Sequence, residues 1–255
     1  MANKIAIITG ASSGIGERLT IDLVQQGNAV IMLARRKEVM EATIKRENFS
    51  EKQAIAISCD VSDYEKFDAA VKEGLEHFRK VFNEDLVLDL FVNNSGVMPL
   101  GPVSEMSVED YTTMVNVNVL GVMHGLRIAS KLMIPNKTGT IVNVSSIAGR
   151  KPFPNHAFYN ATKYGVHGMT EGARHELRTN NIRVIIVAPG AVQTNLLKES
   201  NTDDTVNGYK SWLQQCGGEM LRSEDVSSAI LYAYNAPQRV TIREIVMAGI
   251  TQDDV

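Results

Sequence analysis

Short apolar runs rich in Val and Ile alternate with longer amphipathic stretches along the whole chain. The runs predict strands at residues 5–9, 29–33, 54–59, 88–93, 140–145, 183–188 and 242–248. Most of the segments between them repeat apolar residues at a spacing of about 3.6, which is typical of helices, as in 17–26, 64–80 and 159–179. Strands that are apolar throughout and alternate with helices favour a parallel sheet covered on both faces. The pattern therefore predicts an α/β fold.

No internal repeat, low-complexity tract or Pro/Gly/Ser-rich linker divides the chain, so residues 1–255 are predicted to form a single domain. The segment 195–218 contains several Asn, Asp and Gly residues and follows the end of a predicted strand. Two interpretations of it stay open: a surface loop, or a mobile lid over a bound ligand.

Composition excludes several classes of function. The chain has 26 Lys and Arg against 29 Asp and Glu, a net charge of −3, so no basic surplus is present to bind nucleic acid or an anionic membrane. Two cysteines cannot form a disulfide framework, and five scattered histidines have no metal-ligand spacing. The longest stretch without a charged residue, 111–126, is interrupted by polar residues and makes a poor membrane span. We therefore expect a soluble cytoplasmic protein with no bound metal.

The first predicted strand ends in a glycine-rich turn, and a helical pattern begins at Glu17. Glycines at Gly10, Gly14 and Gly16 permit a tight turn and let backbone amides approach a pyrophosphate at the start of the helix. Glycine-rich turns often only connect elements, but a position between a strand and a helix is typical of a dinucleotide site.

The end of the second predicted strand indicates which dinucleotide binds. NAD-binding units place an acidic residue there to hold the ribose 2′-hydroxyl, whereas this chain has Arg35 and Arg36 followed by Lys37. Arginine can hold a 2′-phosphate through two hydrogen bonds. A solvated start of the next helix accounts for some of these cations, and the cluster favours NADP over NAD.

Candidate catalytic residues lie in the second half of the chain. Tyr159 and Lys163 share one face of a predicted helix, so the phenol and the ammonium can converge on one site. A cation at about 4–6 Å can lower the pKa of a tyrosine by roughly 1–3 units, which makes the pair a plausible proton donor and acceptor. Upstream, a strand ends at Ser145 and Ser146, where a hydroxyl can donate to a substrate oxygen. Two serines that cap a strand end are the structural alternative.

These residues carry a resemblance to the short-chain dehydrogenase/reductase family, in its single-domain branch. The resemblance covers the glycine-rich turn, Asp60-Val61, Asn93-Asn94-Ser95-Gly96, Asn118, Ser146, Tyr159 with Lys163, and Pro189-Gly190 leading to Thr194. It departs from the family pattern at Ser95, where alanine is more frequent. The family fold is a Rossmann fold, a doubly wound seven-stranded parallel sheet with helices on both faces, usually assembled as a homotetramer or a dimer.

The resemblance implies roles for individual residues. Tyr159 would be the general acid and base, and Ser146 would orient the carbonyl. Lys163 would bind the nicotinamide ribose and lower the pKa of Tyr159, while Asn118 would hold a water that links Lys163 to solvent. The residues implied to bind NADP(H) are Gly10, Ser12, Ser13, Gly14, Ile15, Gly16, Arg35, Arg36, Asp60, Val61, Asn93, Ser95, Gly96, Tyr159, Lys163, Pro189, Gly190, Val192 and Thr194.

Residues 237–245 are similar to a subgroup of NADP-dependent reductases related to 3-hydroxy acid and serine 3-dehydrogenases. The substrate stays open. Arg150 and Lys151 could hold a substrate carboxylate or lie on a solvated loop, and the residues 152–154 equally suggest an apolar wall.

The sequence thus predicts an enzyme that reduces a small-molecule ketone or aldehyde with NADP(H), reversibly. The alternative is a cofactor-binding sensor or scaffold without turnover, which would be expected to lack an intact Ser–Tyr–Lys set. A nucleotide-sugar epimerase would need a C-terminal substrate domain that 255 residues do not supply.

Overall fold

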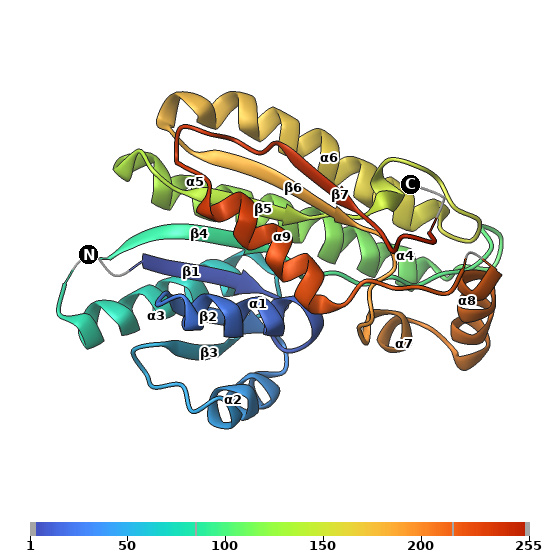
Figure 1. The fold of residues 1–255 in the computed structure, drawn as a ribbon, viewed down its shortest axis with the longest axis horizontal. Coiled ribbons are helices and arrows are strands. Elements are labelled where there is room, and N and C mark those ends of the chain that lie inside the picture. Colours follow the sequence, from blue (N-terminus) through green and yellow to red (C-terminus); the bar gives the residue numbers. More distant parts are fainter. Residues whose placement is uncertain (1–3, 85, 216, 253–255) are drawn as a thin grey trace.

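A single parallel sheet forms the centre of the computed structural model, which describes residues 4–84, 86–215 and 217–252 (Figure 1). The strand order is β3-β2-β1-β4-β5-β6-β7, and all neighbouring strands run in the same direction. The strands are β1 (Lys4–Thr9), β2 (Ala29–Ala34), β3 (Ala54–Ser58), β4 (Val87–Asn93), β5 (Thr140–Val144), β6 (Arg183–Pro189) and β7 (Glu244–Met247). The seven predicted strands and the parallel sheet are confirmed.

Helices connect the strands and cover both faces of the sheet. They are α1 (Gly14–Gln25), α2 (Lys37–Arg46), α3 (Tyr64–Phe82), α4 (Val108–Val115), the π-helical turn η1 (Asn116–Leu120), α5 (Gly121–Met133), η2 (Ile134–Asn136), η3 (Ile147–Gly149), α6 (Ala157–Leu177), η4 (Arg178–Asn180), α7 (Leu196–Ser200), α8 (Asp203–Gln215) and α9 (Ser223–Asn235). Buried residues of α1, α2 and α9 pack on one face, and those of α3, α5 and α6 pack on the other.

The two cores follow from the alternation of side chains along each strand. In β1, Ile8 belongs to the core beneath α1 and α9, whereas Ile7 belongs to the core beneath α3 and α5. Both are fully buried, because successive strand residues point to opposite faces and both faces are covered. This is why the strands are apolar throughout.

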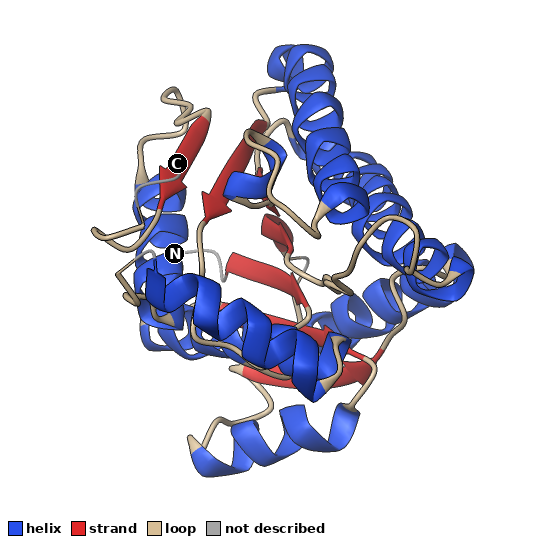
Figure 2. Cartoon of the chain, turned by 90° about the vertical axis from the view of Figure 1, so that its right-hand side faces the viewer, coloured by secondary structure: helices blue, strands red, loops and turns tan. Residues whose placement is uncertain are grey.

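The strand order changes direction at β1, which pairs with β2 on one side and β4 on the other. Crossovers that leave in opposite directions open a crevice beyond the carboxyl ends of the two strands, and ligands of such sheets bind there. In Figure 1 the helices α7 and α8 lie at the right, past these ends, and Figure 2 looks onto the same edge.

Two local predictions differ from the structure. Helix α1 begins at Gly14, inside the glycine-rich turn, rather than at Glu17. The interpretation of 195–218 as a surface loop is wrong, because most of it forms α7 and α8. Val206 and Leu213 are buried seven residues apart on one face of α8, and the polar residues around them hide this spacing in the sequence.

The run of helix Val108–Asn136 is long and apolar enough to cross a membrane by length and composition alone. In the structure several of its apolar residues pack into the interior, while others, such as Val108 and Met123, are exposed. Met114 and Met133 are fully buried, and Ile128 is 2% exposed in the core beneath α3 and α5. The sequence is therefore that of a helix packed against a sheet.

Candidate active site

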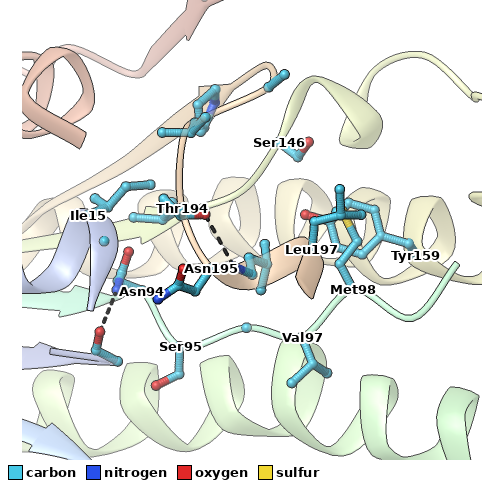
Figure 3. A pocket seen from close by; sticks show the side chains of 18 of the residues that line it. Ile15, Asn94, Ser95, Val97, Met98, Ser146, Tyr159, Thr194, Asn195 and Leu197 are labelled. Carbon is cyan, nitrogen blue, oxygen red and sulfur yellow. Dashed lines mark hydrogen bonds between the residues drawn. The ribbon is translucent and has the colours of Figure 1, made fainter. Parts of the chain in front are cut away.

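A cavity of about 450 Å³ lies at the carboxyl ends of the strands. Its wall combines the glycine-rich turn, the segment after β4, the end of β5, the start of α6, and the helices α7 and α8. Figure 3 shows Asn94, Ser95 and Met98 along the segment after β4, with Thr194 above this segment and Leu197 beside Met98 and Tyr159.

Backbone geometry in the glycine-rich turn requires glycine. Gly10 and Gly14 have φ angles of +67° and +59°, in the left-handed region that other residues rarely adopt. A Cβ on Gly16 would collide with the carbonyl oxygen of Gly10, so the turn closes directly against the start of α1. Ser13 caps α1 without a hydrogen bond from its side chain, which leaves amides of the first turn available to a phosphate group.

Thr9 and Asn94 tie this turn to the end of β4. The Thr9 hydroxyl accepts hydrogen bonds from the backbone N–H groups of Asn94 and Ser95 at 2.9 and 3.0 Å. The Asn94 side chain in turn donates to the Thr9 carbonyl at 3.0 Å. These bonds fix two segments of the cavity wall relative to each other.

Asn93 does not line the cavity, and Asn94 does. Asn93 is still part of β4, where it pairs with Asn143 of β5 and donates to that residue's side-chain oxygen at 2.8 Å. The prediction of Asn93 as a residue lining the cofactor channel is therefore corrected to its neighbour. The sequence shows two adjacent asparagines at this point and does not indicate which of them faces the cavity.

Basic side chains mark the far end of the cavity. Arg35 and Arg36 are exposed on its rim, beyond Ala34 at the end of β2. The Arg36 guanidinium donates to the hydroxyl of Ser12 in the glycine-rich turn at 3.4 Å. Asp60 lines the same region. A group with a negative charge would meet two guanidinium groups there.

Tyr159 and Lys163 are both buried on the cavity side of α6. The Lys163 ammonium lies 5.6 Å from the centre of the Tyr159 ring and donates to the carbonyl oxygen of Val144 at 3.2 Å. Burial lowers the pKa of Lys163 to about 8, because the surroundings disfavour its charged form.

Burial also raises the pKa of the Tyr159 phenol, and the hydroxyl of Ser146 opposes this by favouring the phenolate. The expected lowering by Lys163 is not the dominant effect in this geometry. Both groups therefore favour their neutral forms in this geometry, and moving the phenol proton to the Lys163 amine would cost more here than in water.

Ser146 lies at the end of β5 and begins the short helix η3. Its Oγ accepts a hydrogen bond from the backbone N–H of Ala148 at 3.1 Å, so its own proton can point to a substrate oxygen. Ser145 also lines the cavity, and its buried hydroxyl has no hydrogen-bond partner within the described part of the chain.

Asn118 sits below the cavity rather than in its wall. In the π-helical turn η1 its side chain accepts from the N–H of Val97 and donates to the carbonyl of Val97, both at 2.9 Å. It also donates to the hydroxyl of Thr162 at 3.3 Å, between Tyr159 and Lys163 in sequence. The side chain thereby joins the segment after β4 to α6.

The other predicted residues lie where expected. Apart from Gly16, Asn93 and Asn118, all of the predicted catalytic and cofactor-binding residues line the cavity. Gly16 lies outside the lining, and its missing side chain lets the start of α1 pack directly against the Gly10 carbonyl.

The loop after Ser146 divides into two parts. The Arg150 guanidinium pairs with Glu244 of β7 at 2.6 Å, and neither Arg150 nor Lys151 lines the cavity. Phe153 does line it. The structure thus agrees with the apolar wall and not with a carboxylate site formed by the two cations.

Sequence reasoning missed several residues of the wall. Gln252, near the C-terminal end, is 4% exposed and accepts a hydrogen bond from the N–H of Ala191 at 3.0 Å. Nothing in the sequence connects it to the segment after β6. The aromatic side chains of α8 were also missed, because the segment reads as polar.

Asn201 joins α7 and α8 to the opposite wall. Its side-chain oxygen accepts from the N–H of Leu100 at 2.7 Å, and its amide donates to the carbonyls of Met98 and Leu197 at 2.8 and 2.9 Å. The hydrogen bonds of Asn201 therefore hold the two helices against the segment after β4, where they close one side of the cavity.

Within residues 4–84, 86–215 and 217–252, no cluster of three or more His, Cys, Asp or Glu side chains could hold a metal ion. Cys59 is a free, buried thiol.

Residues 4–205 match the sequence profile of a family described as short chain dehydrogenase. An oxidoreductase of Listeria innocua, described as uncharacterized, is 32% identical over 252 residues, which are 98% of each chain. A counterpart in Listeria monocytogenes is 31% identical over the same length, with the same coverage.

Solved structures agree with this assignment. The closed form of a serine dehydrogenase complexed with NADP⁺ aligns with a TM-score of 0.82 and 30% identity, over 97% of this chain and 96% of that one. A variant of the actinorhodin polyketide ketoreductase with NADPH aligns with a TM-score of 0.86 and 27% identity, over 99% and 100%. With the match over most of its length, the glycine-rich turn and the seven-stranded parallel sheet, the chain belongs to the short-chain dehydrogenase family of oxidoreductases.

Proposed function

We propose that the protein is an NADP(H)-dependent oxidoreductase that reduces a ketone or aldehyde to the alcohol, reversibly. The observation that carries this proposal is that Ser146, Tyr159 and Lys163 meet in one cavity with the glycine-rich turn. An intact set of these three residues also argues against a sensor or scaffold without turnover.

The cavity fits the proposed cofactor. The turn at Gly10 and Gly14, with amides of α1 behind it, suits the pyrophosphate. Arg35 and Arg36 suit the 2′-phosphate of NADP(H). Related structures with NADP⁺ and with NADPH support the same choice. When bound, the cofactor supplies the hydride in reduction or accepts it in oxidation.

The chain's own residues handle the oxygen and its proton. Ser146 donates a hydrogen bond to the carbonyl oxygen and stabilises the negative charge that develops on it. Tyr159 gives its phenolic proton to this oxygen. The ammonium of Lys163 stabilises the phenolate that results, and its lowered pKa lets it give up a proton near neutral pH. The Val144 carbonyl and Asn118, through Val97 and Thr162, hold this geometry.

Replacement of the phenol tests the proposal. Tyr159→Phe is expected to abolish NADPH-dependent reduction while NADPH still binds, because only the hydroxyl is removed. Ser146→Ala is expected to lower kcat by ~10²–10³. Tyr232→Phe, at an exposed tyrosine of α9, is the matched control. NADPH oxidation is followed with a panel of ketones and β-keto esters, and NADP⁺ reduction is followed with 3-hydroxy acids. Tight NADPH binding without turnover of any substrate by the unaltered protein would support the sensor instead.

We further propose that α7 and α8 act as a lid, since they close one side of the cavity and are held to the segment after β4 by Asn201.

The proposed assembly is a homotetramer, with a dimer as the alternative. Its interface would use α4, α5 and α6, where Val108, Met123 and Tyr164 are 67%, 45% and 45% exposed. Location in the cytoplasm stays a prediction.

A further inference from the structure

Aromatic rings form a continuous row along the substrate end of the cavity. Starting at Tyr159, the next ring is His156 at 6.3 Å between centres, and Tyr209 follows at 6.1 Å. Trp212 lies 5.3 Å from Tyr209, and Phe153 lies 6.0 Å from Trp212 in an edge-to-face arrangement. All five side chains line the cavity. The row joins the loop before α6 to the helix α8.

Aliphatic side chains complete this end of the wall. They come from three separate segments of the chain, and all of them line the cavity: Val97, Met98, Leu197, Val206 and Leu213. A planar apolar group placed here would contact both aromatic rings and aliphatic side chains. Such contacts favour an aromatic ring over a saturated ring of similar size, because ring quadrupoles add to the burial of apolar area.

Cations are poorly placed to hold a carboxylate in the same region. The Arg150 guanidinium is engaged by Glu244, and Arg150 lies outside the lining. Lys198 and Lys210 line the cavity from α7 and α8 but are exposed, so solvent screens their charge. The buried Lys163 donates to the Val144 carbonyl and serves the reaction itself.

His156 adds no positive charge either. Its Nδ1 lies 2.6 Å from the carbonyl oxygen of Pro154, which can only accept, so Nδ1 carries the proton. Burial lowers the pKa of His156 and so favours its neutral form. A neutral imidazole continues the aromatic row without attracting an anion.

We propose that the substrate is a neutral ketone that carries an aromatic ring on or close to its carbonyl carbon, and that Phe153, Tyr209 and Trp212 select it over small 3-hydroxy or β-keto acids. This inference rests on the proposed carbonyl reduction and names its substrate class. The row begins at Tyr159, so a ring held along it leaves the adjoining carbonyl within reach of the phenol.

Matched substrates provide the first test. The unaltered protein is assayed by NADPH oxidation with two sets of substrates, and kcat/KM is measured for each compound. The first set is acetophenone and cyclohexyl methyl ketone, which differ in the ring alone. The second set is the neutral ester ethyl benzoylacetate and the acids benzoylacetate and acetoacetate. We expect kcat/KM to be roughly tenfold higher for acetophenone than for its saturated analogue. We also expect the neutral ester to be preferred over both acids.

Variants of the row provide the second test. Trp212→Leu and Tyr209→Leu are each expected to lower the ratio of kcat/KM for acetophenone to that for cyclohexyl methyl ketone from roughly tenfold to about threefold or less, whatever each variant does to the two values separately. Tyr232→Leu, at a tyrosine that is 71% exposed, is the control. Should Trp212→Leu not fold, Trp212→Phe keeps a ring, and its preference should be retained.

Trp212 also reports binding directly, since it is the chain's single tryptophan. With NADP⁺ present, acetophenone is expected to change its fluorescence at lower concentrations than cyclohexyl methyl ketone does. The inference would be overturned if kcat/KM were highest for acetoacetate. It would also be overturned if acetophenone and cyclohexyl methyl ketone gave equal kcat/KM values and changed the fluorescence at equal concentrations. Either result would leave the proposed carbonyl reduction standing. Absence of turnover with every carbonyl compound would instead overturn the proposed function.

Discussion

Choice of cofactor depends on the end of β2, and its reversal is the sharpest prediction. The perturbation is Ala34→Asp combined with Arg36→Ala. Ala34 is 8% exposed at the end of β2, the position where NAD-binding units carry an acid. Arg36 is placed over the glycine-rich turn by its bond to Ser12. The double change removes an attraction for the 2′-phosphate and adds a repulsion.

The magnitude follows from these positions. A hydrogen bond to a charged group contributes about 1.5–3 kcal/mol, or roughly 10- to 150-fold in binding. Because Arg36 is exposed and Arg35 can share the phosphate, we expect the lower value, about tenfold, for Arg36→Ala alone. A carboxylate near the phosphate costs about 1 kcal/mol in water and about 4 kcal/mol at an effective dielectric constant of 20, for unit charges 4 Å apart. Together the two changes should shift the NADPH-to-NADH ratio by at least about 50-fold.

The assay is the ratio of kcat/KM for NADPH and NADH, with each dissociation constant measured from cofactor fluorescence. Lys37→Ala is the matched control, since Lys37 lies next in sequence, pairs with Glu41 and does not line the cavity. A preference of the unaltered protein for NADH would refute the reasoning. So would a ratio that Arg36→Ala and the double variant leave unchanged.

Three further predictions follow from the site. Lys163→Met should abolish turnover yet stabilise the unliganded protein at pH 7 by about 3 kcal/mol. The pKa of Lys163 is near 10.5 in the unfolded chain and about 8 in the folded chain, so between these pH values only the unfolded chain holds the proton. The stability of the unaltered protein therefore rises as the pH increases from about 8 to 10.5. Thermal unfolding measures both the effect of the substitution and this pH dependence. Asn201→Ala should raise KM about tenfold and speed hydrogen exchange in 97–101, whereas Asn207→Ala, exposed on α8, should change neither. Light scattering at micromolar concentration should give a tetramer, and a monomer alone would contradict the proposed interface.

Much of the site could be predicted because the relative positions of its residues depend on segments that are close together in the sequence. The spacing of Tyr159 and Lys163 places both on one face of α6, and the structure keeps both on the cavity side. The glycines of the first turn are required by backbone angles within the same turn. Asn93 and Asn94 were harder to separate, because a shift of one residue moves a side chain from the pairing with Asn143 to the cavity.

The pKa of Tyr159 shows a different limit. The sequence places a cation four residues away and so predicts a lowered pKa. The structure buries both side chains, and the loss of water around the phenol raises its pKa by more than the hydrogen bond with Ser146 lowers it. Burial depends on every element packed around a group, and no spacing along one helix reveals it.

By itself the sequence determined the parallel sheet, the glycine-rich turn and the Ser–Tyr–Lys set, because each depends on periodicity or spacing within one or two adjacent elements. Only the tertiary structure decided that Arg150 pairs with Glu244 outside the cavity lining, that Gln252 supports the segment after β6, and that α8 contributes Tyr209 and Trp212 to the cavity wall. These contacts join residues far apart along the chain. Their existence depends on how the crossovers bring strand ends and helices to one edge of the sheet, which local patterns do not encode.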